Sequence, residues 1–255
     1  MNPVRSVVIT GASSGIGEAL ALAYAGPGAA LGLTGRDAAR LDGVAARCRA
    51  RGAVVEAGVV DAADRAAMAA WFAGFDAAHP VDLVIANAGV SAGTGLNGET
   101  EEQARRIFAV NLDGVLNTIY PAIDAMRGRG RGQVALMASL AGFRGMPGAP
   151  AYCASKAAVR VLGESLRGDL AGQGIGVSVI CPGFVRSRMT ARNPFPMPFL
   201  MDAGPAAELI KRRLARNAGR ISFPWPMAAA VWLLSALPAG WVDRIAARTP
   251  RKPAG

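Results

Sequence analysis

The sequence predicts an α/β fold in which a doubly wound parallel sheet lies between two layers of helices. Short apolar runs with β-branched residues alternate with longer, Ala-rich segments from residue 4 to residue 181. The run at 81–86 is apolar nearly throughout, as expected of a parallel strand buried on both faces. Hydrophobic residues make up 52% of the chain and charged residues 18%, which supplies a large core and excludes a wholly disordered protein.

Each element follows from this alternation. Strands are expected at 4–10, 29–34, 53–59, 81–86, 132–138 and 175–181, with a short further strand at 220–223. Helices are expected between them, at 15–25, 37–50, 62–78, 100–127 and 150–172. Because no repeat or low-complexity linker interrupts the series, we expect residues 1–255 to form a single domain with a cofactor-binding and catalytic core at 1–183.

A glycine-rich turn, TGASSGIG at 10–17, connects the first strand to the first helix. Glycines permit a tight turn and let a pyrophosphate approach the backbone, while the helix N-terminus adds amide donors and a favourable dipole. An ordinary strand-to-helix turn could also have this composition. Its position at the first turn of an alternating α/β chain favours nucleotide binding.

Tyr152 and Lys156 are four residues apart, so on a helix they share one face. A phenol has an ordinary pKa of about 10, and a nearby ammonium would lower that pKa. Tyr152 could then act as a general acid when a ketone is reduced and as a base in the reverse direction. A Tyr and a Lys on a solvated helix face would explain the spacing alone, but Ser139 stands thirteen residues upstream.

The glycine turn, spaced GxxxGxG, is accompanied by Asn87-Ala88-Gly89, Asn111, Ser139 and the segment 152–156. Together these motifs resemble the short-chain dehydrogenase/reductase family over residues 4 to about 190. The resemblance implies a Rossmann-type sheet and hydride transfer between a nicotinamide cofactor and a carbonyl or carbinol carbon. It also suggests a homodimer or homotetramer packed through the helices at 100–127 and 150–172.

The resemblance implies a catalytic set of Asn111, Ser139, Tyr152 and Lys156. Ser139 is similar to the family serine that orients the substrate oxygen, and Lys156 to the lysine that also holds the nicotinamide ribose. Asn111 resembles the asparagine whose backbone holds a water in the proton relay. A kink or cap in the helix is a compatible alternative for Asn111.

Cofactor contacts are implied at the loops that follow the strands. Asp61 resembles the residue that accepts from the adenine amino group, with a helix N-cap as its alternative role. Asn87 to Gly89 would pass near the adenosine, although support of the sheet explains them as well. Ser187 replaces the usual threonine of the family's PG motif, whose backbone meets the carboxamide. The complete set comprises Gly11, Ser13, Ser14, Gly15, Ile16, Gly17, Arg36, Asp61, Asn87, Ala88, Gly89, Tyr152, Lys156, Pro182, Gly183, Val185 and Ser187.

The end of the second strand decides the cofactor preference. A carboxylate there would bind the 2′-OH of NAD, whereas an arginine would pair with the 2′-phosphate of NADP. Gly35 stands where the family's NAD-type aspartate usually stands, and Arg36 follows it. The sequence therefore favours NADP(H) over NAD(H), with Ser13 as a second phosphate contact. Asp37 opposes this preference unless it serves as a helix N-cap.

The C-terminal quarter differs in character from the rest. The chain has 28 Lys+Arg and 18 Asp+Glu, a net charge of +10, yet residues 184–255 alone carry 12 cations and 3 anions. The segment 193–205 combines four prolines with Phe and Met, which predicts a mobile flap over a pocket within a substrate flap region at 184–222. An apolar and basic extension with three tryptophans follows at 223–255.

Two interpretations of this extension remain open. It could lie on an anionic bilayer as an amphipathic segment, or it could cap the substrate pocket or a dimer interface. Both favour a hydrophobic carbonyl or alcohol substrate. The basic charge could instead attract the thioester of a phosphate-bearing acyl carrier or of coenzyme A.

Other classes of function are disfavoured. Cys48, Cys153, Cys181 and the single His79 lack metal-ligand spacing, so neither a metal site nor a disulfide is expected, and a reducing cytoplasm fits. No targeting signal is evident and no apolar stretch reaches ~18 to 20 residues, so we expect a cytoplasmic protein, peripheral at most on the inner membrane surface. No nucleic-acid-reading motif accompanies the positive charge. A non-catalytic nucleotide-binding or membrane-surface scaffold is the competing function, but a scaffold would need none of the four catalytic residues.

Overall fold

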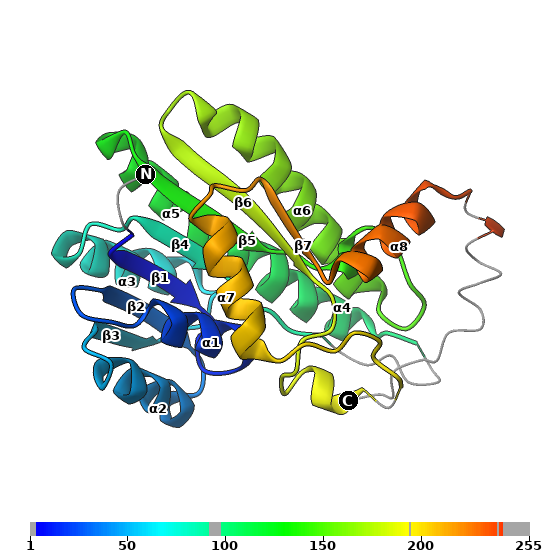
Figure 1. Ribbon diagram of the computed structural model, residues 1–255, viewed down its shortest axis with the longest axis horizontal. Helices are drawn as coiled ribbons and strands as arrows, with labels where there is room; N and C mark the ends of the chain where they lie inside the picture. Colours follow the sequence, from blue (N-terminus) through cyan, green and yellow to red (C-terminus); the bar gives the residue numbers. More distant parts are fainter. Residues whose placement is uncertain (1–3, 92–97, 194, 239, 242–255) are drawn as a thin grey trace.

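The computed structural model describes residues 4–91, 98–193, 195–238 and 240–241. Seven parallel strands form one sheet in the order β3-β2-β1-β4-β5-β6-β7 (Figure 1). The strands are β1 (Ser6–Thr10), β2 (Ala30–Gly35), β3 (Val54–Val59), β4 (Leu83–Ala86), β5 (Gly132–Met137), β6 (Ile175–Pro182) and β7 (Arg220–Phe223). Because the strand order reverses between β1 and β4, the sheet has a crevice outside its carboxyl ends where ligands bind in such folds.

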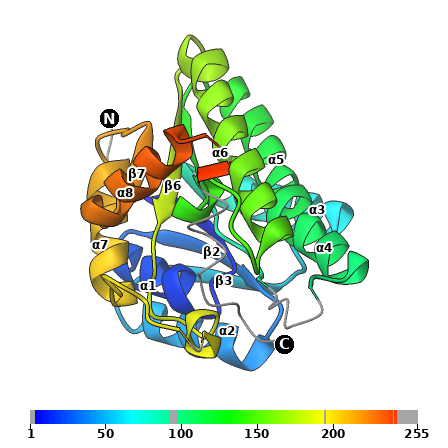
Figure 2. The ribbon, with the colours of Figure 1, turned by 90° about the vertical axis from the view of Figure 1, so that its right-hand side faces the viewer.

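Helices cover both faces of the sheet (Figure 2). The helices are α1 (Gly15–Tyr24), α2 (Ala38–Arg49), α3 (Arg65–Ala78), α4 (Glu101–Phe108), α5 (Gly114–Arg129), α6 (Pro150–Ala171), α7 (Ala203–Leu214) and α8 (Trp225–Ala236). One layer contains α1, α2 and α7, and the other contains α3, α5 and α6. The predicted α/β fold class is confirmed, and each expected strand begins and ends within two residues of the observed one.

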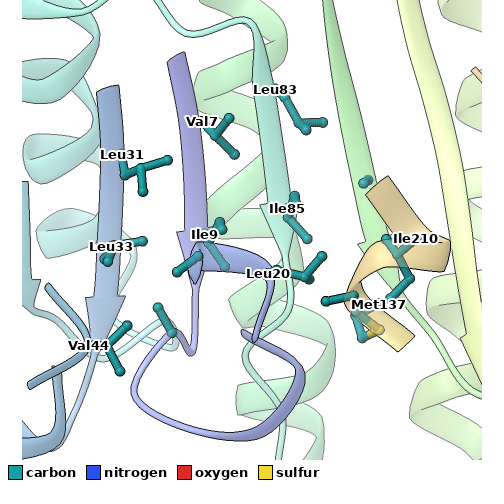
Figure 3. Packing of buried hydrophobic residues seen from close by; sticks show 14 of the residues in the cluster. Val7, Ile9, Leu20, Leu31, Leu33, Val44, Leu83, Ile85, Met137 and Ile210 are labelled. Atoms are coloured by element: carbon teal, nitrogen blue, oxygen red, sulfur yellow. The ribbon is translucent and has the colours of Figure 1, made fainter. Parts of the chain in front are cut away.

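Successive side chains of each strand point to opposite faces of the sheet and so contribute to the core on both faces. Val7 and Ile9 of β1 pack with Leu20 of α1 and Ile210 of α7 in one core (Figure 3), whereas Val8 points into the opposite core. All these side chains are buried. The strands are therefore apolar on both faces, which is why they read as continuous hydrophobic runs in the sequence.

Capping residues fix where several helices begin. Asp37 accepts a hydrogen bond from the Arg40 backbone N–H at the start of α2, so its alternative role as an N-cap is confirmed. Asp64 does the same for α3 by accepting from Ala67. The helix expected at 62–78 therefore starts three residues later, and the N-cap role considered for Asp61 is wrong. Asp61 instead accepts from the Ala63 N–H, two residues on, in a turn before the helix.

The helix expected at 100–127 is interrupted. A π-helical turn over Ala109–Asp113 separates α4 from α5, and the Gly114 N–H bonds to the Ala109 carbonyl five residues back. Within this turn the Asn111 side chain bonds to the backbone of Val90, which follows β4. A tertiary contact therefore accompanies the irregular turn, as is common for π-helical turns near functional sites.

The second half of the expected flap region at 184–222 is mostly regular structure. Residues 203–214 form α7, which packs on α1, and 220–223 form the predicted seventh strand. Only the part before α7 borders the large cavity described below. Of the C-terminal extension, α8 and Trp241 are described, whereas the predicted basic end at 242–255 lies outside the described residues.

Candidate active site

A cavity of about 1190 Å³ lies at the carboxyl ends of the strands. Its lining includes residues that end or follow six strands, from Gly11 after β1 to Pro182 at the end of β6. The volume exceeds the roughly 300 to 1,000 Å³ of most pockets for drug-sized ligands. The cavity can therefore hold a dinucleotide together with part of a second molecule.

The glycine turn is closely packed against the loop after β4. Gly11 has φ +67°, and a Cβ on it would lie 2.8 Å from the Cα of Ala88. A Cβ on Gly17 would collide with the Gly11 carbonyl oxygen. Only glycine fits these two positions, and the turn thereby brings backbone groups to the cavity wall, where a pyrophosphate can approach them.

Asn87 holds this turn in place. Its Nδ2 donates to the carbonyl oxygens of Thr10 (2.9 Å) and Gly11 (3.2 Å). The hydroxyl of Thr10 in turn accepts from the backbone N–H groups of Asn87 and Ala88. Support of the sheet is therefore a role the structure shows for Asn87, and Thr10 is a supporting residue that the sequence did not single out.

Three of the four predicted catalytic side chains, those of Ser139, Tyr152 and Lys156, line one wall of the cavity. Ser139 follows β5, and Tyr152 and Lys156 lie one helical turn apart near the start of α6. The Ser139 hydroxyl accepts from the Ala141 N–H (3.1 Å) and donates to the Pro182 carbonyl oxygen (3.4 Å). The Lys156 Nζ donates to the Met137 carbonyl oxygen (2.8 Å) and lies 5.9 Å from the centroid of the Tyr152 ring.

Burial determines the protonation of these groups. Lys156 is only 3% exposed, and desolvation lowers its pKa to about 8. Tyr152 is half-buried, but close packing around its phenol raises the pKa of Tyr152 above its ordinary value, against the opposing effect of the Ser139 side chain. The expectation that the Lys156 ammonium lowers the pKa of Tyr152 is therefore wrong for this state of the protein. The Lys156 Nζ is bonded to a backbone carbonyl, and desolvation outweighs any charge effect on the phenol.

Asn111 lies behind the cavity wall rather than on it. Its side chain is fully buried, accepts from the Val90 N–H (2.8 Å) and donates to the Val90 carbonyl (3.0 Å) and to the Ser155 hydroxyl (3.1 Å). A Cβ on Gly89 would lie 3.3 Å from both the Asn111 Oδ1 and the Lys156 Nζ. Asn111 therefore ties the loop after β4 to α6, the helix that carries Tyr152 and Lys156.

Charged side chains meet at the end of β2. Arg36 and Asp61 are 3.8 Å apart, and the Arg40 Nη1 lies 2.6 Å from the Asp37 Oδ2. All four residues line the cavity. A Cβ on Gly35 would touch Ser13 at 3.2 Å, so a larger residue there would press on the glycine turn. Arg40 was missed because it lies on α2, one helical turn after Arg36, where it reads as a solvated helix residue.

The end of β6 and the loop after it form another part of the cavity lining. Pro182, Gly183, Val185 and Ser187 all contribute to it. The Gly183 N–H bonds to the Phe223 carbonyl, and the Ser187 hydroxyl accepts from the Thr190 N–H at 3.3 Å. Of the predicted cofactor residues, the only one that does not line the cavity is Gly17, which packs beneath the turn.

The remaining part of the cavity is mainly apolar. Its walls come from the loop after β6 and from α8, by Phe195, Pro196, Pro198, Met227, Val231 and Leu234. Arg144 and Arg188 also line the cavity, and the Arg144 Nη1 donates to the Leu237 carbonyl at the end of α8 (3.2 Å). Arg144 follows β5 within a glycine-rich loop, where the sequence has no pattern that indicates a site.

Two absences hold for the described part of the chain. No three His, Cys, Asp or Glu side chains come together there as metal ligands. No helix in the described ranges is both long and apolar enough to cross a bilayer.

Comparisons with known proteins agree with this geometry. The chain matches the family model of short chain dehydrogenases over residues 5–195. An uncharacterized oxidoreductase of Myxococcus xanthus is 40% identical over 245 residues, covering 96% of this chain and 97% of that protein.

Two solved structures are also similar over nearly their whole length. A short chain dehydrogenase/reductase from Burkholderia phymatum in complex with NAD is 28% identical with a TM-score of 0.83, covering 99% of this chain and 98% of that one. A short-chain dehydrogenase from Sphingobium yanoikuyae in complex with NADPH is 27% identical with a TM-score of 0.81, covering 99% of both chains. The predicted resemblance is confirmed: the chain belongs to the short chain dehydrogenase family and is an oxidoreductase of that family.

Proposed function

We propose that the protein is an NADP(H)-dependent oxidoreductase that interconverts a hydrophobic ketone or aldehyde and the corresponding alcohol. The observation that carries this proposal is the meeting of Ser139, Tyr152 and Lys156 on one wall of a cavity that the glycine turn also lines. A nucleotide-binding or membrane-surface scaffold would require the turn but not the hydroxyl, phenol and buried ammonium beside it.

The residues present fit a nicotinamide dinucleotide. Gly11 and residues 13–16 of the glycine turn line the cavity, and the crevice continues to the loop at 182–187. The glycine turn would hold the pyrophosphate, Asp61 the adenine side and the loop after β6 the nicotinamide side. When bound, the cofactor supplies the hydride for reduction or accepts it in oxidation.

Tyr152 is the proposed proton donor and acceptor. The raised pKa of Tyr152 keeps its phenol protonated near neutral pH, the form that can donate to a carbonyl oxygen. Ser139, which lines the same cavity as Tyr152, would orient that oxygen, and Lys156 would hold the cofactor ribose from its position one helical turn away. Asn111 would act through Lys156 by fixing the loop that contains Gly89.

Preference for NADP(H) is supported by the side chains at the end of β2. The Arg36–Asp61 and Arg40–Asp37 pairs are both substantially exposed, and exposed ion pairs contribute little, roughly 0 to 1 kcal/mol each. A 2′-phosphate can therefore recruit both guanidinium groups at small cost. Asp37 is already occupied as the N-cap of α2, which removes the main objection to this preference.

A hydrophobic substrate is supported by the apolar walls that α8 and the loop after β6 contribute. A second candidate substrate rests on a separate observation. Arg144 and Arg188 both line the cavity, so a carbonyl compound carried as the thioester of a phosphate-bearing carrier would find two cations there.

We also propose a homodimer or homotetramer, because Tyr120 of α5 and Val161 of α6 are apolar, substantially exposed and on the layer through which self-association is expected. We further propose that the protein is located in the cytoplasm, where reducing conditions suit its three buried free cysteines. Within the cytoplasm, we propose that it makes peripheral contact with the inner membrane surface.

The test is NADPH oxidation by the purified chain against ketones of rising chain length. We expect kcat/KM to rise with chain length and to be at least about tenfold lower with NADH. Activity confined to small polar sugars or acids would contradict the hydrophobic substrate. For thioester substrates, a KM that increases with salt while that of neutral ketones does not would favour the carrier-bound substrate.

A further inference from the structure

The helix α8 is apolar around its whole circumference and yet lies at the surface. Its sequence is WPMAAAVWLLSA, and no charged residue occurs anywhere from 221 to 242. Figure 1 shows α8 at the edge of the molecule, beyond the sheet. A surface helix in water normally carries charged residues on its outer side, and an all-round apolar helix is normally enclosed. One side of α8 therefore lacks the apolar cover that its sequence requires.

The two sides of α8 have different surroundings. Met227, Val231 and Leu234, spaced for one face of a helix, line the candidate active-site cavity. Trp225, Trp232 and Leu233 on the other side are 78%, 61% and 60% exposed. The helix α8 thus separates the apolar end of the cavity from the outside of the molecule.

Charge distinguishes between the possible occupants of the outer face. A second copy of the chain would bring a net charge of +10 toward a chain that already carries +10. An anionic bilayer attracts that charge, and the 12 cations and 3 anions of residues 184–255 place most of the excess in the part of the sequence that includes α8. Arg144, bonded to the carbonyl of Leu237, also places a guanidinium at the end of the helix.

We propose that the outer face of α8 docks on an anionic phospholipid bilayer, so that a lipophilic substrate enters the cavity from the membrane alongside this helix. The substrate part of this inference rests on the proposed function. Trp225 and Trp232 lie in the headgroup region, where tryptophan is favoured, and Leu233 inserts toward the acyl chains.

The length of α8 fixes the mode of contact. Twelve residues span about 18 Å, well below the roughly 30 Å of a hydrocarbon core. The helix therefore lies in the plane of the interface. In that orientation the inner face of α8 still lines the cavity that Ser139 and Tyr152 also line. The apolar wall of the cavity then lies next to the lipid.

The experiment measures co-sedimentation of the full chain with vesicles of phosphatidylcholine alone or with about one-third phosphatidylglycerol. We expect binding to the anionic vesicles, weaker binding in 0.5 M salt and little binding to neutral ones. The double variant Trp225→Ser/Trp232→Ser should bind roughly tenfold more weakly or worse. Leu233→Glu provides an independent second variant on the same face.

The matched control is Val54→Ser/Val59→Ser, which removes two exposed apolar side chains from the edge strand β3, far from α8 in the sheet order. This control should bind vesicles as the parent protein does. With a short, water-soluble ketone and no vesicles, kcat/KM of the α8 double variant should stay within about twofold of the parent value. With a long-chain ketone presented in anionic vesicles, it should fall roughly tenfold, in proportion to lost binding.

The outcomes separate this inference from the proposed function. Absence of binding to anionic vesicles, or equal losses in the α8 and β3 variants, overturns the docking. A parent protein that self-associates without binding vesicles, and that dissociates in the Trp225→Ser/Trp232→Ser variant, assigns the face to a second copy and also overturns it. Turnover of the soluble ketone in either case leaves the proposed function standing. Vesicle binding through α8 without turnover of any ketone supports the docking and contradicts the proposed function.

Discussion

Burial opposes the charged forms of both Tyr152 and Lys156 in the candidate active site. It raises the pKa of Tyr152 and lowers the pKa of Lys156 to about 8. Near neutral pH the phenol is protonated and the ammonium is still largely charged. This combination is the one that the proposed proton donation from Tyr152 to a carbonyl oxygen requires.

The activity should therefore depend on pH in a defined way. As pH rises through about 8, Lys156 loses its proton and with it the charge proposed to hold the cofactor ribose. We expect kcat/KM for ketone reduction to fall above about pH 8 with the slope of a single proton, while the protonated Tyr152 causes no loss in that range. Initial rates from pH 6 to 10 at fixed ionic strength check this, and a profile flat to pH 10 would contradict it.

Burial of the charged Lys156 side chain should also lower the free energy of unfolding. A lysine whose folded pKa is below its unfolded value of about 10.4 destabilises the folded state at neutral pH, and this cost disappears as pH rises from about 8 to about 10.4. The variant Lys156→Met removes the buried charge, so we expect the free energy of unfolding at pH 7 to increase by about 2 kcal/mol while activity is lost. Urea unfolding at pH 7 and pH 10 measures this; a variant less stable than the parent at pH 7 would show that the bond to Met137 outweighs desolvation.

Arg36 is the residue on which the cofactor preference depends most. Arg36→Ala should raise KM for NADPH roughly tenfold or more and leave KM for NADH nearly unchanged, because only NADPH carries the 2′-phosphate. Arg40→Ala, whose guanidinium is held by Asp37, should have a smaller effect of the same kind. Arg47→Ala, on the same helix but paired with Glu18, serves as the control. Equal changes for both cofactors would remove Arg36 from the phosphate site.

At the scale of elements, the start of α6 is fixed from outside the helix. Ala149 is its N-cap and supplies no side-chain hydrogen bond, but the Glu99 Oε2 accepts from the Ala151 N–H (2.9 Å), next to Tyr152. A carboxylate at a helix N-terminus also interacts favourably with the helix dipole. Glu99 therefore positions the first turn of the helix that carries Tyr152 and Lys156.

Glu99→Ala should lower kcat more than it raises KM for the cofactor and should reduce stability by about 1 kcal/mol, as loss of a cap does. Glu99→Gln retains an oxygen acceptor and should recover much of both. Glu101→Ala, which breaks only an exposed ion pair with Arg105 on α4, should change neither. Steady-state kinetics and thermal unfolding of the three variants test the positioning role, and identical behaviour of Glu99→Ala and Glu101→Ala would disprove it.

The same elements show what could be predicted from the sequence. The strands could be placed because each is a short run buried on both faces. The π-helical turn at Ala109–Asp113 could not, because it accompanies a contact between Asn111 and Val90 that lies 21 residues away in the chain. The helix α7 was missed although its buried residues Ala206, Ala207, Ile210 and Leu214 have helical spacing. The preceding prolines drew attention to irregular structure instead.

At the scale of the whole molecule, the sheet brings together groups that are far apart in the chain. The cavity has a charged end at β2 and α2 and an apolar end at α8, with Ser139 and Tyr152 in its lining as well. The motif residues of the site could be found from the sequence because turn geometry and proton transfer restrict them to a few residue types. Arg40, Glu99 and Arg144 could not, since their roles depend on where other loops pass and leave no local pattern.

The charge distribution gains a spatial meaning from this arrangement. The +10 of the chain belongs mostly to residues 184–255, whose described part supplies the apolar walls of the cavity and the exposed face of α8. The proposed catalytic groups lie in the nearly neutral remainder. Substrate access and chemistry are thus assigned to different parts of the sequence, and variants of α8 and of α6 should affect different kinetic constants.

The central claim is that Tyr152 transfers the proton in an NADPH-dependent reduction. The most direct measurement compares the parent protein with Tyr152→Phe, in single-turnover NADPH oxidation with a hydrophobic ketone and in NADPH binding by fluorescence. We predict that the variant binds NADPH within about threefold of the parent and loses at least about 10²-fold in the rate of oxidation, as removal of a general acid does. A Tyr152→Phe protein that reduces the ketone at the parent rate would contradict the claim.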